Sequence, residues 1–375
     1  MSSPGAESLS AHLRSHLQSH LQSHLRVAIA GAGGWLPFDR YMAIALYAPG
    51  LGYYARGSGQ IGLWPGSGSD FVTAPELSPL FGAALARQVG QALDAAGADE
   101  VFEFGAGTGA LAAQVLGTLG PRVRRYSIVD LSGSLRARQA ARLAPFGDRV
   151  QWLDAWPAQM HGVVLGNEVL DAMPVQLLHW DGLDWWERGV GLGLGADGLT
   201  WADRRTTLRP PVEAGFEPGT VVEIHPQAQA FITTLGERLA RGLALFIDYG
   251  FPEAEYYHPQ RTGGTLMCHH AHLSDADPLD RPGEKDITAH VNFTGIALAA
   301  QAAGLDVLGY TSQARLLMNC GLLDLMQGAD PHTLSAAHKL IAEHEMGELF
   351  KAIALSRGVD FQPLGFAAGD RTHRL

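Results

Sequence analysis

The chain has 375 residues, of which 46% are hydrophobic, and a formal net charge of −11 at pH 7. This length allows one large domain or a core domain with a substantial insertion. The negative charge disfavours nonspecific nucleic-acid binding, which depends on Lys and Arg, and it favours a basic protein or peptide as a partner. The two cysteines, Cys268 and Cys320, exclude a disulfide framework and a thiolate zinc site.

Residues 1–26 form a low-complexity tail in which His-Leu recurs every four residues. The repeated histidines are His12, His16, His20 and His24. On a helix they would lie in one row at the i, i+4 spacing of a metal chelate, but we expect only an extension of a helix near Leu25 to Ala32, and no metal. The tail lacks the apolar core of a signal peptide, and no apolar run could span a bilayer, so we expect a cytoplasmic protein without membrane association.

Residues 27–98 are expected to form a helical and loop segment that covers the site. Between Pro37 and Ser78 the chain is rich in Gly, Pro and aromatic residues. This composition predicts ordered loops that form a lid or a wall over a site. A helix from about Pro79 to Ala96 then leads into the core.

The stretch from Val101 to Leu111 predicts a strand, a glycine turn and a helix. Gly105, Gly107 and Gly109 allow the backbone to turn sharply and to approach a ligand closely. The same glycines also satisfy a dinucleotide fingerprint, but Glu103 just upstream would not help to bind a pyrophosphate. S-adenosylmethionine (SAM) carries an ammonium and a sulfonium, so an acid at this position favours SAM, with S-adenosyl-homocysteine as its product.

Strands and helices alternate after the glycine turn, which predicts a doubly wound, Rossmann-like α/β sheet. The strand 126–130 ends in Asp130, which we predict to bind the ribose hydroxyls, with Leu131 beside it as a further cofactor contact. The strand 150–154 ends in Asp154, a candidate acceptor for the adenine amine. The alternative is that both acids cap the helices that follow them.

A fourth strand, 162–166, is followed directly by three polar residues that are candidates for the cofactor and reaction site. Because ligands bind at the carboxyl ends of parallel strands, we expect Asn167 to contact the cofactor and Glu168 and Asp171 to face the transferred group. Two carboxylates could hold a guanidinium through forked hydrogen bonds and could remove its proton. The alternative is that they cap a helix or bind backbone N–H groups.

The rest of the chain predicts one insertion and a return to the core. Residues of about 175–220 form a β-rich insertion, after which the core resumes with strand 221–225, helix 227–240 and strand 242–250. His269, His270 and His272 alternate on a strand, which disfavours a metal site. Asp286 and His290 are candidates for the site wall or a general base, or they tie a loop to the next helix. The core spans 99–312, and a C-terminal helical segment, 313–375, completes it.

Several motifs together resemble the MidA family of SAM-dependent methyltransferases of bacteria and mitochondria. They are residues 51–54, 68–82, 102–109, 166–174, 247–250, 264–266 and 286–293, within a match that covers most of 37–358. The resemblance implies a class I methyltransferase fold and arginine methylation of a protein, as in the mitochondrial member associated with a subunit of respiratory complex I. This chain departs from the usual motifs at Ala106, Ala110, Ala112 and Asn292, and the target and oligomeric state stay open.

Overall fold

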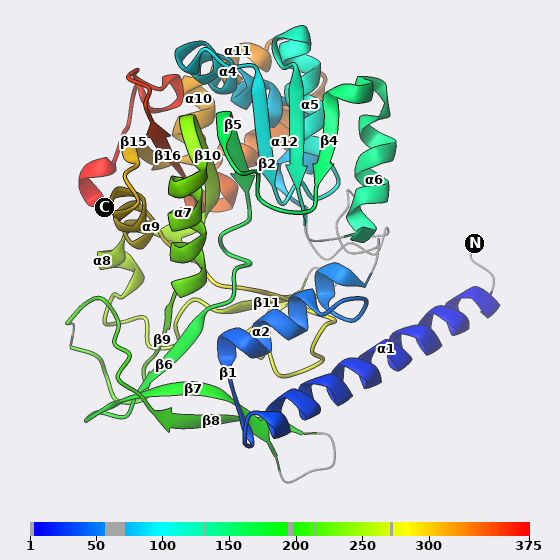
Figure 1. The fold of residues 1–375 in the computed structure, drawn as a ribbon, viewed down its shortest axis with the longest axis vertical. Coiled ribbons are helices and arrows are strands. Elements are labelled where there is room, and N and C mark those ends of the chain that lie inside the picture. The colour runs from blue at the N-terminus through cyan, green and yellow to red at the C-terminus, as the bar shows by residue number, and fades with distance from the viewer. Residues whose placement is uncertain (1–3, 57–71, 131–132, 194–197, 214, 271–272) are drawn as a thin grey trace. The chain divides into compact units, whose positions relative to one another are not determined.

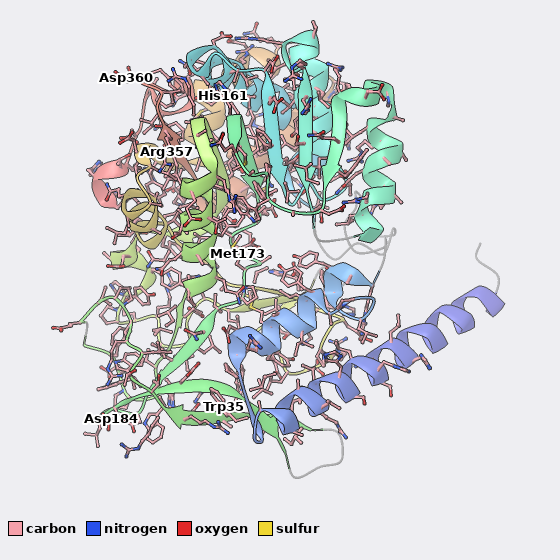
Figure 2. All side chains as sticks on the ribbon, viewed as in Figure 1. Trp35, His161, Met173, Asp184, Arg357 and Asp360 are labelled. Atoms are coloured by element: carbon pink, nitrogen blue, oxygen red, sulfur yellow. The ribbon has the colours of Figure 1, made fainter. Side chains whose placement is uncertain are left out.

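The computed structural model describes residues 4–56, 72–130, 133–193, 198–213, 215–270 and 273–375, although not the side chains of 4–15, 133 and 134. The chain divides into two compact units. The first contains residues 1–57, 173–226 and 257–289, and the second contains 58–172, 227–256 and 290–375. In Figure 2, Trp35, Met173 and Asp184 belong to the first unit, and His161, Arg357 and Asp360 belong to the second.

The second unit is built on a largely parallel sheet. Its strands are β2 (Glu100–Phe104), β3 (Arg125–Val129), β4 (Val150–Leu153), β5 (Met160–Asn167), β10 (Leu239–Phe251), β15 (Asp306–Ser312) and β16 (Phe350–Arg357). They lie in the order β15-β16-β10-β5-β2-β3-β4, and the short strand β14 (Val291–Asn292) pairs with the end of β10. The predicted doubly wound α/β sheet is confirmed, because the pairs from β10 to β4 are all parallel.

Helices cover both faces of this sheet (Figure 1). The helices of the second unit are α3 (Ala74–Leu77), α4 (Pro79–Ala96), α5 (Ala110–Leu119), α6 (Gly133–Leu143), α7 (Pro226–Arg238), α8 (Glu253–Tyr256), α9 (Phe293–Ala302), α10 (Gln313–Asn319), α11 (Leu322–Leu325) and α12 (Pro331–Ile341). Val101 and Val163 share one apolar core with residues of α4 and α5. On the opposite face Phe104 packs against Phe231 of α7, with ring centroids 5.2 Å apart. The alternation of strand side chains therefore produces two buried faces.

The C-terminal segment is not only helical. It also contributes β16, which lies between β10 and β15 and runs antiparallel to both. Its residues are buried except for the half-buried Arg357, so its sequence has no polar face to mark the strand period. A short apolar run of this kind cannot be assigned to helix or strand by periodicity alone.

The first unit contains a five-stranded antiparallel sheet. Its strands are β1 (Trp35–Pro37), β6 (Gln176–Trp180), β7 (Trp185–Leu192), β8 (Leu199–Arg205) and β9 (Val221–Ile224), in the order β1-β7-β6-β9 with β8 beside β7. The predicted β-rich insertion is present. The prediction that strand 221–225 resumes the core is wrong, because β9 pairs with β6 in this sheet. Residues 221–224 carry the same short β pattern as the insertion, so their partner could not be inferred from the sequence.

Two helices of the first unit differ from the sequence prediction. Helix α1 spans Pro4–Gly31, much further than the expected Leu25–Ala32, and Leu21, Leu25 and Ile29 are buried along it. Helix α2 (Phe38–Tyr47) lies where ordered loops were expected. Its buried residues recur at the helical spacing i, i+3, i+4, i+7 and i+8, a signal that the surrounding Gly and Pro obscured.

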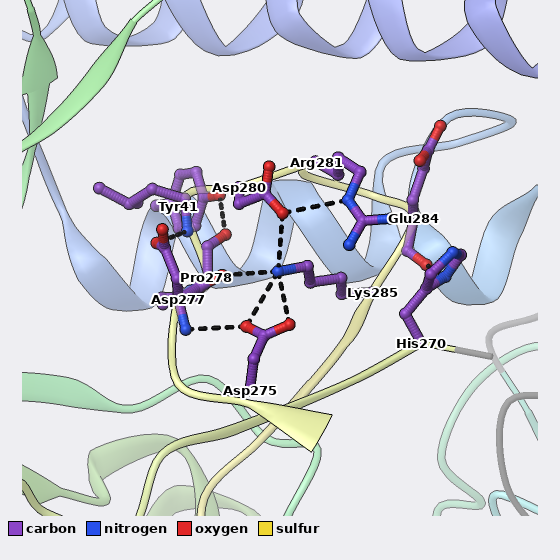
Figure 3. A network of polar contacts seen from close by, with 10 residues as sticks. Tyr41, His270, Asp275, Asp277, Pro278, Asp280, Arg281, Glu284 and Lys285 are labelled. Atoms are coloured by element: carbon purple, nitrogen blue, oxygen red, sulfur yellow. Dashed lines mark hydrogen bonds and ion pairs between the residues drawn. The ribbon is translucent and has the colours of Figure 1, made fainter. Parts of the chain in front are cut away.

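A buried lysine organises a loop of the first unit, between β12 (Leu273–Asp275) and β13 (Asp286–Thr288), which flank β11 (Met267–His270). The Lys285 side chain is 2% exposed, and its Nζ lies 2.8 Å from Asp275 Oδ2 and 3.0 Å from Asp280 Oδ2. It also donates to the carbonyl oxygen of Asp277 at 3.1 Å (Figure 3). These oxygens compensate the burial of the ammonium.

Candidate active site

The glycine turn joins β2 to α5 in the second unit. Gly105 and Gly107 have φ angles of +64° and +54°, in the left-handed region that side chains disfavour. The Gly105 N–H donates to the carbonyl of Val129, at 3.1 Å, which ties the turn to the end of β3. A Cβ at Gly105 would lie 2.9 Å from Val169, whereas a Cβ at Gly107 would meet no atom of the described residues within 4 Å. A side chain of the protein therefore lies against the first glycine of the turn. Beside the second glycine the described residues leave room for a ligand to approach the main chain.

Glu103 is buried directly before this turn, with 2% of its surface exposed. Its Oε2 accepts a hydrogen bond from the Tyr126 hydroxyl at 2.7 Å. Burial raises the pKa of Glu103 to about 8; the Tyr126 hydrogen bond opposes this rise and the charge of Asp130 adds to it. Without a ligand, the acid predicted to attract SAM is therefore largely protonated at neutral pH.

The two other strand-end acids have different surroundings. Asp130 Oδ2 accepts a hydrogen bond from the buried Gln139 amide at 2.8 Å, which fixes one of its oxygens at the end of β3. The Asp154 side chain is 86% exposed and pairs with Arg136 at 2.7 Å. Their contacts with ribose and adenine stay predictions. Leu131 lies outside the residues that the structure describes.

Asn167 and Glu168 form the end of β5 and the turn that follows it. Glu168 has a φ of +55°, which is unusual for a residue with a side chain. Its N–H donates to the carbonyl of Ile247 in β10 at 2.9 Å, and its Oε1 accepts from Asn167 Nδ2 at 2.9 Å. The Oδ1 of Asn167 is buried and has no hydrogen-bond partner within the described part of the chain. A strained residue and an unused acceptor at a strand end are typical of a binding site.

Asp171 and Asp248 form a buried carboxyl pair behind this turn. Asp248 Oδ2 accepts hydrogen bonds from the N–H groups of Val169 and Leu170 at 3.0 and 2.9 Å, and a longer one from Asp171 at 3.3 Å. Thus Asp248 binds the backbone of the turn, and the Asp171 carboxylate also accepts hydrogen bonds from backbone N–H groups, its own and that of Ala172. Burial raises the pKa of Asp171 to about 6, and burial together with the charges of Asp171 and Glu168 raises the pKa of Asp248 well above its ordinary range. The pair therefore retains a proton near neutral pH.

Asp286 and His290 lie in different units. In the first unit, the Tyr54 hydroxyl lies 2.9 and 3.0 Å from the two carboxylate oxygens of the buried Asp286. In the second, the His290 ring stacks on Phe251 with centroids 5.2 Å apart and meets the Tyr249 ring edge to face at 5.4 Å. A catalytic role for His290 stays a prediction.

Three side chains that contact the glycine turn or Asp130 were not predicted from the sequence as site residues. They are Glu76, Gln139 and Arg142. The available signal was the occurrence of Gln139 and Arg142 three residues apart on the helix after Asp130, which places them on one face. Glu76 belongs to a motif of the family resemblance, but its residue type alone did not indicate its partners.

In the described part of the chain, no helix is long and apolar enough to cross a membrane. The described residues also include no group of three or more His, Cys, Asp or Glu side chains arranged to hold a metal ion.

Comparisons with known proteins agree on one enzyme class. Residues 84–311 match the S-adenosyl-L-methionine-dependent methyltransferase family. A protein from Burkholderia thailandensis, crystallised with S-adenosyl-homocysteine, is 49% identical over 100% of this chain and 99% of its own, with a TM-score of 0.93. Two curated relatives are named mitochondrial protein arginine methyltransferase NDUFAF7. The one from Danio rerio is 27% identical over 85% of this chain and 83% of its own, and the one from Mus musculus is 29% identical over 84% and 79%.

Proposed function

Because the chain belongs to this family of SAM-dependent methyltransferases, we propose that it methylates arginine side chains of a protein substrate. The family settles the choice that the glycine turn left open between SAM and a dinucleotide. The strand order of the second unit, with one antiparallel strand inserted next to the edge, is that of the predicted class I fold. The curated relatives named protein arginine methyltransferases support the arginine target.

The cofactor residues of the proposal lie at the ends of adjacent strands. The open side of Gly107 leaves room for a ligand beside the main chain, and Asp130 offers a carboxylate of the kind that binds ribose hydroxyls. Bound SAM supplies an electrophilic methyl group on a sulfonium. Glu103, neutral when the site is empty, would become ionised beside the ammonium of the cofactor and release its proton.

The acidic turn after β5 is the observation that carries the proposal for the acceptor. Glu168 is held by Asn167, and Asp171 has a buried Oδ1 without a hydrogen-bond partner in the described part of the chain. A guanidinium has five N–H donors that match paired carboxylates, so this turn suits an arginine better than a lysine. An ionised Glu168 or Asp171 would orient the guanidinium and accept the proton that methylation releases.

The test uses SAM with an isotopically labelled methyl group, the purified chain, and two peptides that differ only in carrying Arg or Lys. Label on arginine, identified by mass spectrometry, is the expected result. Glu168→Gln and Asp171→Asn should bind S-adenosyl-homocysteine normally but transfer methyl groups at least about 100-fold more slowly. Transfer to lysine alone would overturn the arginine assignment, and cofactor binding without turnover on any host protein would favour a non-catalytic SAM-binding assembly factor.

We also propose that the substrate segment is basic and that the protein acts in the cytoplasm. The net charge of −11 supports a basic partner, and the reducing environment of the cytoplasm suits the two free, buried cysteines. The curated relatives are named as mitochondrial proteins, so subcellular fractionation is the direct measurement of location.

A further inference from the structure

One face of α6 packs against the back of the glycine turn. Gln139, Arg142 and Leu143 share this face because they are three and four residues apart on the helix. The first two contact Gly107 and Thr108. The third limits the space at Gly109, where a Cβ would lie 3.3 Å from the Leu143 side chain and 3.5 Å from the Gln139 backbone. Helix α6 therefore lies against three successive residues of the glycine turn, at positions 107, 108 and 109.

Gln139 uses its whole amide in this contact. Its Nε2 donates to the carbonyl of Gly107 at 2.9 Å and to Asp130 Oδ2 at 2.8 Å. Its Oε1 accepts from Trp152 Nε1 at 2.9 Å, and because an indole N–H can only donate, this bond fixes the orientation of the amide. One fully buried side chain therefore sets the distance between the glycine turn and the acid predicted to bind ribose.

Thr108 is held from two sides by an ion pair. Arg142 Nη1 contacts Glu76 Oε1 of α3 at 2.5 Å and also donates to the Thr108 hydroxyl, which in turn contacts Glu76. The Glu76 side chain is 4% exposed and that of Arg142 is 33% exposed. A carboxylate buried this deeply needs its guanidinium partner, so the loss of either charge would disturb the turn.

We propose that Gln139, Arg142 and Glu76 are positioning residues for the cofactor: they fix the glycine turn and Asp130 in the arrangement that binds S-adenosyl compounds. They bind the turn through the Gly107 carbonyl and the Thr108 hydroxyl, while the Cβ side of Gly107 stays open. The three residues therefore affect cofactor binding indirectly, by holding the glycine turn in place. This inference rests on the proposed function only for its choice of cofactor.

The experiment measures S-adenosyl-homocysteine binding by titration calorimetry for the whole protein and its variants. Gln139→Leu, Arg142→Lys and Glu76→Gln should each raise the dissociation constant about 10- to 100-fold, because each removes hydrogen bonds to a charged or buried partner. In a methyl-transfer assay, the KM for SAM should rise while the KM for the acceptor stays unchanged. Arg122→Gln is the matched control, since Arg122 pairs with Asp94 on the surface of the same unit, and it should bind as the wild type does.

A double variant separates positioning from general loss of folding. Glu76→Gln together with Arg142→Met removes both charges, so it should be more stable than Glu76→Gln alone or Arg142→Met alone, while S-adenosyl-homocysteine affinity stays reduced. Wild-type affinity in folded single variants, or in the folded double variant, would overturn the inference and leave the methyltransferase assignment intact. If the wild-type protein did not bind S-adenosyl-homocysteine, that result would instead count against the proposed function.

Discussion

The buried acid before the glycine turn gives a prediction about stability and pH. Glu103 holds its proton in the folded chain up to a pKa of about 8, whereas its ordinary value is 4.5. Between these values the folded state binds more protons than the unfolded state, so the free energy of unfolding falls as pH rises. One pKa unit is worth about 1.4 kcal/mol, so the full difference of 3.5 corresponds to about 5 kcal/mol.

Glu103→Gln should remove this dependence. The amide is uncharged and of nearly the same size, and its oxygen can still accept the hydrogen bond from Tyr126. The stability of the variant relative to the wild type should therefore increase by about 3.5 kcal/mol between pH 5 and pH 8. Most of this gain in the relative stability of Glu103→Gln should appear above pH 5.5, where Glu103 of the unfolded wild-type chain has already lost its proton.

The assay is equilibrium denaturation of both proteins in parallel, without cofactor, at half-unit intervals from pH 5 to pH 8. Glu100→Gln is the matched control, because Glu100 begins the same strand, is only partly buried and pairs with Arg124. If the difference in stability between Glu103→Gln and the wild type stayed constant over this range, Glu103 would not retain a proton in the folded chain and the reasoning would fail.

Four further substitutions test three separate parts of the structure. Asp130→Ala should weaken S-adenosyl-homocysteine about 10- to 100-fold in titration calorimetry with little change in melting temperature, and unchanged affinity would exclude it as a cofactor ligand. Gly107→Ala should cost about 1 kcal/mol of stability through its positive φ alone, whereas Gly105→Ala should cost about 2 to 3 because it also meets a neighbouring side chain; equal costs in urea denaturation would contradict this. Lys285→Met should destabilise the protein by about 2 kcal/mol, since Asp275 loses its buried partner, and a wild-type melting temperature would refute that role.

The central sheet could be predicted because its strands and crossover helices carry strong local signals. Helix 110–119 follows a glycine turn, and helix 79–96 begins at Ser78, whose side chain accepts from the Leu80 N–H, and ends at Gly97 with a φ of +65°. Strand-end acids follow from the same alternation, since parallel strands present their carboxyl ends at one edge. These features need only neighbours in the sequence to be recognised.

The features that escaped prediction depend on partners far along the chain. Strand β9 has the length and composition of a core strand, and only its pairing with β6 shows where it belongs. Glu76 reaches Thr108 and Arg142, which lie 32 and 66 residues away, so nothing in its surroundings indicated an ion pair. Asp248 was visible as a strand-end acid, but its three backbone donors belong to a turn 77 to 79 residues earlier.

The place of β16 in the sheet has a consequence for synthesis of the chain. Strand β15 pairs with β16 and with no other strand in the described part of the sheet, and β16 also covers one side of β10. A nascent chain that ends before residue 350 therefore leaves β15 without its partner and exposes the long apolar edge of β10. Such an edge can recruit strands from other chains. Translation must pass residue 357 before β10 and β15 can both pair with the whole of β16, so premature termination before this residue should yield aggregating fragments rather than a smaller enzyme.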